Sequence, residues 1–241
     1  MASLEGKVAI VTGGSRGIGL AVSAALLQRG VHVAVTGVNK DHLEKAEADL
    51  ARVATQGARV LPFAVDVRDH LAVASLVDET VRRQDGLDIL VNNAGVGWFG
   101  SVESQGHDDW RRVFDTNVTG IFNCCKAAVP HLRRRGGGYI INISSLAGSN
   151  PFSGGASYCA SKAAVDAFSE ALMQEVRQDG IRVSYVKPGS VNTDFMGHAD
   201  PQNDWKLRAE DVAQVVVDLV SHDERSLPSR VEIRPSKPPK K

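Results

Sequence analysis

Short apolar runs rich in β-branched residues alternate with longer segments of helical pattern along nearly the whole chain, and this alternation constrains the fold most. Nearly continuous apolar runs are typical of strands buried on both faces of a parallel sheet. Parallel neighbours require right-handed crossovers through helices. We therefore expect an α/β fold with a doubly wound parallel sheet of about seven strands flanked by helices. The expected strands are Val8–Val11, Val31–Val35, Val60–Val65, Ile89–Val91, Tyr139–Ile143, Val183–Val186 and Val231–Ile233, and the expected helices are Ile18–Arg29, Asp41–Thr55, His70–Arg83, Asp109–Arg134, Ser157–Gln178 and Ala209–Ser221.

Size and composition place these elements in one domain. The chain has 241 residues, of which 43% are hydrophobic and 23% charged, values typical of a globular protein. Its 28 lysines and arginines balance 28 aspartates and glutamates, so its charge gives no reason to expect a nucleic-acid partner. We expect a single domain over residues 1–234 and a flexible, basic, proline-rich tail over 235–241.

Targeting and cysteine patterns favour the cytoplasm. The N-terminus has no basic region followed by a long apolar run, and no stretch approaches the ~18 apolar residues of a membrane helix. The three cysteines, Cys124, Cys125 and Cys159, form neither a CxxC pair nor a ligand cluster. We therefore expect a cytoplasmic protein with reduced thiols, no membrane partner and no bound metal.

A glycine-rich loop, TGGSRGIG at 12–19, directly follows the first expected strand. Glycines let the backbone turn tightly and approach a pyrophosphate, whose charge then rests on free N–H groups at the helix start. Taken alone, such a loop is as often an ordinary strand–helix turn. Its place between a strand and a helix favours a dinucleotide site, for which we expect contacts from Gly13, Ser15, Arg16, Gly17, Ile18 and Gly19.

The end of the second strand bears on the choice of dinucleotide. An acidic residue there would bond the ribose 2′-hydroxyl of NAD, but the stretch Thr36–Asn39 contains none. Arg16 can supply charge for a 2′-phosphate, so the sequence favours NADP(H) over NAD(H). Alternatively, Arg16 is a solvated loop cation and the protein accepts both.

Polar or small residues also follow the third and fourth strands, where open α/β sheets bind ligands. The Asp66 carboxylate, followed by Val67, could accept from the adenine amino group, and the NNAG stretch at 92–95 could admit the adenosine ribose. Each alone could be a cap or turn. We expect cofactor contacts from Asp66, Val67, Asn93, Ala94 and Gly95.

Four residues form the candidate catalytic group: Asn117, Ser145, Tyr158 and Lys162. Tyr158 and Lys162 are four apart and share one helix face. A nearby ammonium and a bound nicotinamide cation would favour the phenolate and lower the tyrosine pKa from ~10. Ser145 could bond the substrate oxygen, and Asn117 could hold a water that links Lys162 to solvent. A lone Y-x-x-x-K pair is usually a surface contact, but its order behind the other motifs favours catalysis.

The combination resembles the short-chain dehydrogenase/reductase family over about Lys7 to Ile233, in look closest to its beta-ketoacyl acyl-carrier-protein reductases. The family motifs TGxxxGxG, NNAG and the Asn-Ser-Tyr-Lys set match in order, and a Pro-Gly…Thr motif matches Pro188, Gly189 and Thr193. The resemblance implies a Rossmann-type fold. It also implies that Val191 and Thr193 bond the nicotinamide carboxamide and that Tyr158 and Lys162 contact the cofactor. The family's usual basic residue is absent at Val38, which removes half of the phosphate clamp.

The substrate is the least constrained feature. The resemblance implies hydride transfer between NADPH and a carbonyl or secondary alcohol, with a 3-oxoacyl thioester as the first candidate. A short lid at 194–207 favours an open cleft. The alternatives are a general carbonyl reductase and an NADP-dependent 3-hydroxy acid dehydrogenase, for which Lys187 or Arg208 would supply the cation. A dinucleotide-binding sensor or scaffold without turnover is the non-enzyme alternative. The resemblance further implies a homotetramer, or else a homodimer, formed through the long helices and the last strand.

Overall fold

Seven strands form one parallel sheet in the computed structural model, which describes residues 3–55, 57–196 and 202–239. The strand order is β3-β2-β1-β4-β5-β6-β7, and each neighbouring pair is parallel. This confirms the expected single-domain, doubly wound fold. The strands are β1 (Val8–Val11), β2 (His32–Gly37), β3 (Val60–Ala64), β4 (Ile89–Asn92), β5 (Gly138–Ile143), β6 (Ile181–Pro188) and β7 (Arg230–Ile233).

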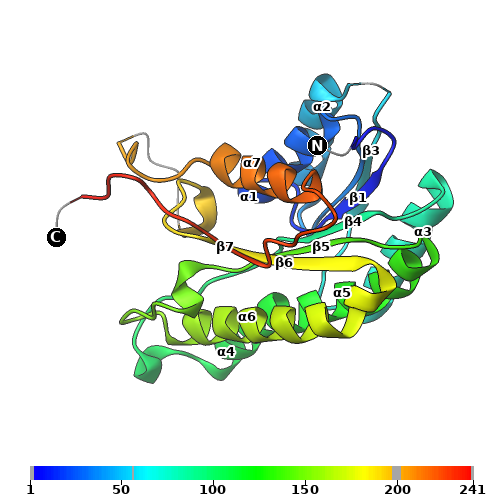
Figure 1. Ribbon diagram of the computed structural model, residues 1–241. Coiled ribbons are helices and arrows are strands. Elements are labelled where there is room, and N and C mark those ends of the chain that lie inside the picture. The colour runs from blue at the N-terminus through cyan, green and yellow to red at the C-terminus, as the bar shows by residue number, and fades with distance from the viewer. Residues whose placement is uncertain (1–2, 56, 197–201, 240–241) are drawn as a thin grey trace.

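Helices cover both faces of the sheet (Figure 1). One face carries α1 (Gly17–Leu27), α2 (Lys40–Val53) and α7 (Ala209–Val220), and the other carries α3 (His70–Gln84), α4 (His107–Phe114), α5 (Gly120–Arg134) and α6 (Ala156–Val176). The strand side chains alternate between two cores. Val11 packs toward α1 and α7, whereas its neighbour Ile10 packs toward α3 and α5. The continuous apolar strands therefore reflect burial on both faces.

The expected helix Asp109–Arg134 is helical throughout, but it contains a π-turn that the sequence analysis did not predict. The chain forms α4, then a π-helical stretch over Asp115–Thr119, then α5. A π-turn bonds each carbonyl to the fifth residue along, which rotates the following side chains relative to a regular helix. The interruption places Asn117, which is fully buried, inside the turn.

The sheet order locates the ligand crevice. Because β1 pairs with β2 on one side and β4 on the other, the connections run in opposite directions from β1. The carboxyl ends of β1 and β4 therefore flank the topological switch point, where open α/β sheets bind ligands. The glycine loop and the NNAG stretch both leave the sheet at this edge.

Two expected segments lie at the border of the described chain. The lid at 194–207 begins with a short 3₁₀ turn, Asp194–Met196, and residues 197–201 lie outside the described residues. In the tail, residues 236–239 are exposed, and 240–241 lie outside the described part. Within the described chain, no helix is long and apolar enough to cross a membrane, and no group of three metal-binding side chains comes together.

Candidate active site

The glycine loop packs so tightly that side chains would not fit in it. A Cβ on Gly13, which has φ +62°, would lie 2.9 Å from the Cα of Ala94. A Cβ on Gly19 would lie 2.3 Å from the carbonyl oxygen of Gly13 and 2.4 Å from Nδ2 of Asn93. The loop backbone is thus held directly against the end of β4. This close approach leaves its outer face as bare backbone, which suits a pyrophosphate.

The start of α1 differs from the starts of α2 and α3. Asn39 caps α2 by accepting from His42 N, and Asp69 caps α3 by accepting from two backbone N–H groups. Within the described chain, α1 has no side-chain cap at Arg16 and no acidic residue in its first turn. Its first N–H groups and its positive dipole end therefore remain available to an anion. On these observations the residues present fit a dinucleotide.

The loop also reaches the end of β2, where the adenosine ribose is expected. A Cβ on Gly37 would lie 2.8 Å from Oγ of Ser15, so the two segments are in contact there. Arg16 follows Ser15, is exposed, and makes no ion pair within the described chain. Val38 is 73% exposed. Lys40 is a second exposed cation, at the first position of α2 and two residues after Val38. The sequence analysis did not consider it.

Asp66 and Val67, the two cofactor-contact candidates after the third strand, already contact other residues of the chain. The Asp66 carboxylate is bonded by Arg68 at 2.6 Å, and this contact lowers the pKa of Asp66. Val67 is buried against Gly120, and its carbonyl accepts from Asn123 at 3.0 Å. A contact of Asp66 with adenine therefore stays a prediction, and it would have to share the carboxylate with Arg68.

Thr12 ties the glycine loop to the NNAG stretch, a role that the sequence reasoning missed. Its buried hydroxyl accepts from the backbone N–H of Asn93 at 3.0 Å and of Ala94 at 3.1 Å. In return, Nδ2 of Asn93 donates to the carbonyls of Thr12 and Gly13, each at 3.0 Å. The two motifs therefore form one rigid unit at the switch point.

Asn117 fixes the chain that follows NNAG. Its Oδ1 accepts from Val96 N at 2.8 Å, and its Nδ2 donates to Val96 O at 2.9 Å and to Oγ of Ser161 at 3.0 Å. Both amide donors are therefore used. The expected water on this side chain stays a prediction, and only the second lone pair of Oδ1 is left for it.

Two of the other candidate catalytic side chains, Ser145 and Lys162, lie close to Tyr158. The Lys162 ammonium lies 5.8 Å from the centroid of the Tyr158 ring, and the Ser145 side chain acts on the Tyr158 hydroxyl in the direction that lowers its pKa. Nζ of Lys162 donates to the carbonyl of Ile143 at 2.9 Å, two residues before Ser145. Asn117 and Lys162 both border Gly95, whose Cβ would lie 3.3 Å from Oδ1 of Asn117 and 3.7 Å from Nζ of Lys162. The sheet edge thus brings together the residues that the sequence analysis selected.

The charges of this group are set mainly by burial. Burial raises the pKa of Tyr158, and the Ser145 hydrogen bond only partly opposes that rise. Burial likewise lowers the pKa of Lys162 from 10.5 to about 8, against the opposing charge of Asp166. The expectation that the ammonium lowers the pKa of Tyr158 is therefore not met by the chain alone.

The Pro-Gly…Thr segment closes the other side of the crevice. A Cβ on Gly17, which has φ +54°, would lie 3.5 Å from Cγ2 of Thr193, so this segment touches the start of α1. Val191 pairs with Leu207 in an isolated bridge, which ties the segment before the lid to the last residue of the lid. Gly189 approaches Leu146, next to Ser145. The segment therefore spans from the glycine loop to the candidate catalytic group.

Phe99 and Phe195 pack against Tyr158, and Phe152 packs against Phe99; we call these three residues the aromatic wall. The rings of Phe99 and Phe195 each lie 5.6 Å from the Tyr158 ring, and Phe152 lies 6.2 Å from Phe99. Phe152 is 47% exposed and Phe195 is 42% exposed. Phe99 and Phe152 lie in loops whose meeting no local sequence pattern signals.

Neither candidate cation for a substrate carboxylate joins this wall. The Lys187 side chain is 1% exposed and paired with Asp166. Arg208 stands at the start of α7, where it borders a hollow of about 480 Å³ with Gly17 and Thr193 between α1 and α2. The wall itself consists of phenylalanine rings, which suits an apolar substrate group.

Comparison with known proteins agrees with this geometry. The model of the short chain dehydrogenase family matches residues 7–204. The glycine betaine reductase ATRR of Emericella nidulans is 36% identical and covers 98% of this chain, although this chain spans only 19% of that protein. The 2,3-dihydro-2,3-dihydroxybenzoate dehydrogenase of Bacillus subtilis is 32% identical, covering 97% of this chain and 86% of that one. A 3-oxoacyl-acyl-carrier-protein reductase of Chlamydia muridarum is 35% identical, covering 84% of this chain and 82% of that one.

Solved structures match over nearly the full length. A metagenomic short-chain oxidoreductase in complex with NADP has a TM-score of 0.86 and 33% identity, covering 98% of this chain and 100% of that one. An NAD⁺-bound xylitol dehydrogenase has a TM-score of 0.89 and 29% identity, with the same coverage. These neighbours carry different dinucleotides. The chain belongs to the short-chain dehydrogenase/reductase family of nicotinamide-dependent oxidoreductases.

Proposed function

We propose that this enzyme uses NADP(H) to interconvert an uncharged ketone and its secondary alcohol, with Tyr158 as the acid/base. The observation that carries the proposal is the convergence of Ser145, Tyr158 and Lys162 beside an uncapped helix start and a bare glycine loop. A pyrophosphate would rest on Gly17, Ile18 and Gly19. The bound dinucleotide supplies the hydride.

The side chains then have distinct tasks. Tyr158 delivers its phenolic proton to the substrate oxygen as charge develops there, while Ser145 bonds the same oxygen. The Lys162 ammonium stabilises the phenolate that remains, because opposite charges favour each other in a buried site. Val191 and Thr193 orient the nicotinamide carboxamide. Asn117 keeps the 95–96 backbone in place beside Lys162.

The cofactor preference rests on the end of β2. No carboxylate stands there to repel a 2′-phosphate, and Arg16 follows directly on the residue that touches Gly37. A guanidinium bonds phosphate oxygens through two parallel N–H groups, which makes it a good phosphate ligand. We therefore assign NADP(H) as the preferred cofactor.

The aromatic wall supports a substrate with an apolar group next to its carbonyl. A 3-oxoacyl thioester fits this description and is the first candidate, followed by a general ketone. A 3-hydroxy acid is the third candidate, because Lys187 is buried and paired with Asp166, which leaves Arg208 as the remaining one of the two cations considered for its carboxylate. The deciding comparison is between 3-oxoacyl thioesters, neutral aryl ketones and 3-oxo acids of equal length.

The test is the oxidation of NADPH with this panel. Turnover of a neutral ketone or thioester, with Phe99→Ala raising its KM and Phe63→Ala on β3 leaving it unchanged, supports the proposal. Efficient turnover of the 3-oxo acid alone would contradict the substrate assignment. Binding of NADPH without turnover of any compound would favour a sensor or scaffold.

We also propose a cytoplasmic homo-oligomer, a tetramer first and a dimer second. All three cysteines are free and buried, as suits a reducing compartment. Phe122 on α5 is 47% exposed and Trp110 on α4 is 43% exposed, and these apolar side chains support a contact through these helices. Light scattering of the purified protein measures the mass directly, and a monomer at micromolar concentration would contradict the assembly.

A further inference from the structure

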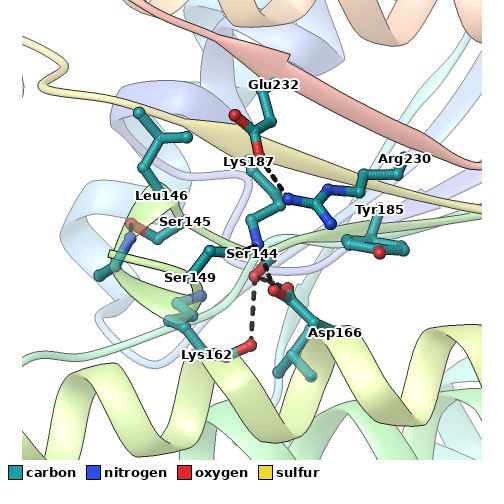
Figure 2. A network of polar contacts seen from close by, with 12 residues as sticks. Ser144, Ser145, Leu146, Ser149, Lys162, Asp166, Tyr185, Lys187, Arg230 and Glu232 are labelled. Atoms are coloured by element: carbon teal, nitrogen blue, oxygen red, sulfur yellow. Dashed lines mark hydrogen bonds and ion pairs between the residues drawn. The ribbon is translucent and has the colours of Figure 1, made fainter. Parts of the chain in front are cut away.

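A buried ion pair lies directly behind the candidate catalytic group (Figure 2). Lys187 on β6 points toward α6, where its ammonium bonds the Asp166 carboxylate and the Ser149 hydroxyl. Among the ion pairs that the structure describes, its cation is the least exposed, at 1%, and its carboxylate is 16% exposed. Nothing in the proposed chemistry so far uses this pair.

The Asp166 carboxylate connects the pair to both catalytic segments. Its second oxygen accepts from Oγ of Ser144, the residue before Ser145. The same Ser144 hydroxyl lies 3.3 Å from the carbonyl oxygen of Lys162, and Ser144 N donates to Val186 O at 2.8 Å. Asp166 also stands one helical turn after Lys162. A single carboxylate thus touches the end of β5 and faces the catalytic turn of α6.

The chain at Gly148 packs closely against Asp166. A Cβ on Gly148 would lie 2.9 Å from Oδ2 of Asp166 and 3.0 Å from the carbonyl oxygen of Lys162. The short 3₁₀ turn Leu146–Gly148 therefore presses onto α6 at this level. Gly148 contacts both the Asp166 carboxylate and the backbone of Lys162. Because these groups are packed together, we expect a change in the charge of Asp166 to act strongly on Lys162.

Stability alone is a weak reason for this arrangement. Burying two charges costs several kcal/mol, and well-packed apolar residues often replace such a pair without loss. An ion pair beside a functional ammonium can have a further use, because it holds a carboxylate at a fixed distance from that ammonium. The charge of Asp166 opposes the effect of burial on the pKa of Lys162.

We propose that Asp166 and Lys187 are positioning residues for the reaction: the Asp166 carboxylate favours the ammonium of Lys162 and anchors the β5 end that carries Ser145, while Lys187 holds that carboxylate in place and limits its effect on Lys162. The proposal rests on the proposed function, in that it takes Lys162 as a catalytic group. Lys187 is then a structural counterion and not a substrate-binding cation.

Other charged and titratable groups also face Asp166. On its own helix Glu170 accepts from the Tyr185 hydroxyl at 2.9 Å. On β7 Arg230 bonds Glu232 at 2.6 Å, an ion pair that Figure 2 marks with a dashed line. Arg230 and Tyr185 also interact electrostatically with Asp166, but both stay unchanged in every variant of the test, so the charges that the test varies are those of the pair. The full set is Lys162 and Glu170 on α6, Tyr185 and Lys187 on β6, and Arg230 and Glu232 on β7.

The experiment measures the pKa of Lys162 itself in the cofactor-free protein, by NMR titration of carbon-13-labelled lysine. The signal is assigned by its loss in Lys162→Arg. Asp166→Asn removes the negative charge and is expected to lower the pKa of Lys162 by about one unit, the size of one charge across one helical turn. Lys187→Met removes the positive charge and is expected to raise it.

Opposite shifts from the two variants are the signature of the proposal, because a general loosening of the structure would move both the same way. The double variant is expected to return the pKa of Lys162 toward the wild-type value. Asp88→Asn, which removes a carboxylate bonded to Val8 N at the other end of the sheet, is the matched control and should leave Lys162 unchanged. If Asp166→Asn does not fold, Lys187→Met alone decides.

No shift in Lys187→Met, or equal shifts in both variants, would overturn the proposal. This outcome is independent of turnover. If Tyr158→Phe keeps its activity, the proposed function fails whatever Lys162 shows. If Tyr158→Phe is inactive and Lys162 does not respond, only the positioning role fails. In the reductase assay, the upper pH limit of kcat should follow the NMR shift and move down in Asp166→Asn.

Discussion

Arg16→Ala tests the cofactor assignment at a single side chain. Arg16 is exposed at the start of α1, and its neighbour Ser15 touches the end of β2. The variant removes the guanidinium and keeps the loop backbone, whose glycines supply the pyrophosphate contacts. NADPH should therefore lose affinity, whereas NADH, which has no 2′-phosphate, should keep nearly all of it.

The exposure of Arg16 limits the size of the effect. A hydrogen bond to a charged group contributes about 1.5–3 kcal/mol, whereas an exposed ion pair contributes about 0.2–1 kcal/mol. A bidentate contact at an exposed site lies between these ranges, so we take about 1.5 kcal/mol. That corresponds to roughly a tenfold rise in the Kd of NADPH. Because exposed charges are screened by salt, the loss should shrink toward threefold at about 1 M salt.

Fluorescence titration of the wild type and the variant with both cofactors measures these values. Arg29→Ala is the matched control, since Arg29 is an exposed arginine just past the other end of α1. An equal loss of NADPH and NADH affinity in Arg16→Ala would refute the phosphate contact. So would a loss in Arg29→Ala of the same size.

Three further variants test the site. Gly19→Ala should weaken NADPH binding at least tenfold, because the new Cβ would stand 2.3 Å from a loop carbonyl; calorimetric titration measures this, and Gly106→Ala, where the nearest side-chain atom is 3.7 Å away, should bind normally. Val38→Arg should tighten NADPH by roughly threefold to tenfold by adding a second cation beside the 2′-phosphate, and an unchanged Kd would mean that the end of β2 does not face it. Lys162→Met should be inactive yet about 1–2 kcal/mol more stable to urea at pH 7, because it removes a buried ammonium whose pKa is lowered to about 8. Since the unfolded chain holds that proton up to about pH 10.5, wild-type stability should rise relative to the variant between pH 8 and pH 10.5, and a constant difference would contradict the lowered pKa.

The fold follows from sequence because its signals are local and repeated. Each expected strand overlaps an observed one, since continuous burial on both faces imposes an apolar run that needs no knowledge of the partner strand. The π-turn inside the helix expected at Asp109–Arg134 was not predicted. A π-turn has no residue preference strong enough to be recognised in a sequence, and the turn at Asn117 reflects the hydrogen bonds that this amide makes to Val96.

The candidate site was predictable where motifs carry it and not where side chains meet across loops. Tyr158 and Lys162 were found through their helical spacing, and the glycines through their place after β1. The aromatic wall was largely missed, because Phe99 and Phe152 meet only when two loops fold over Tyr158. Lys187 was taken as a possible substrate cation, since nothing in its neighbours along the chain announces a carboxylate on another element.

The most direct test of the central claim compares NADPH oxidation by the wild type and by Tyr158→Phe with neutral ketones and 3-oxoacyl thioesters, in parallel with NADPH binding. The account predicts turnover by the wild type, a loss of at least a thousandfold in kcat for the variant, and a Kd for NADPH that changes less than threefold. Substantial activity without the Tyr158 hydroxyl would contradict it.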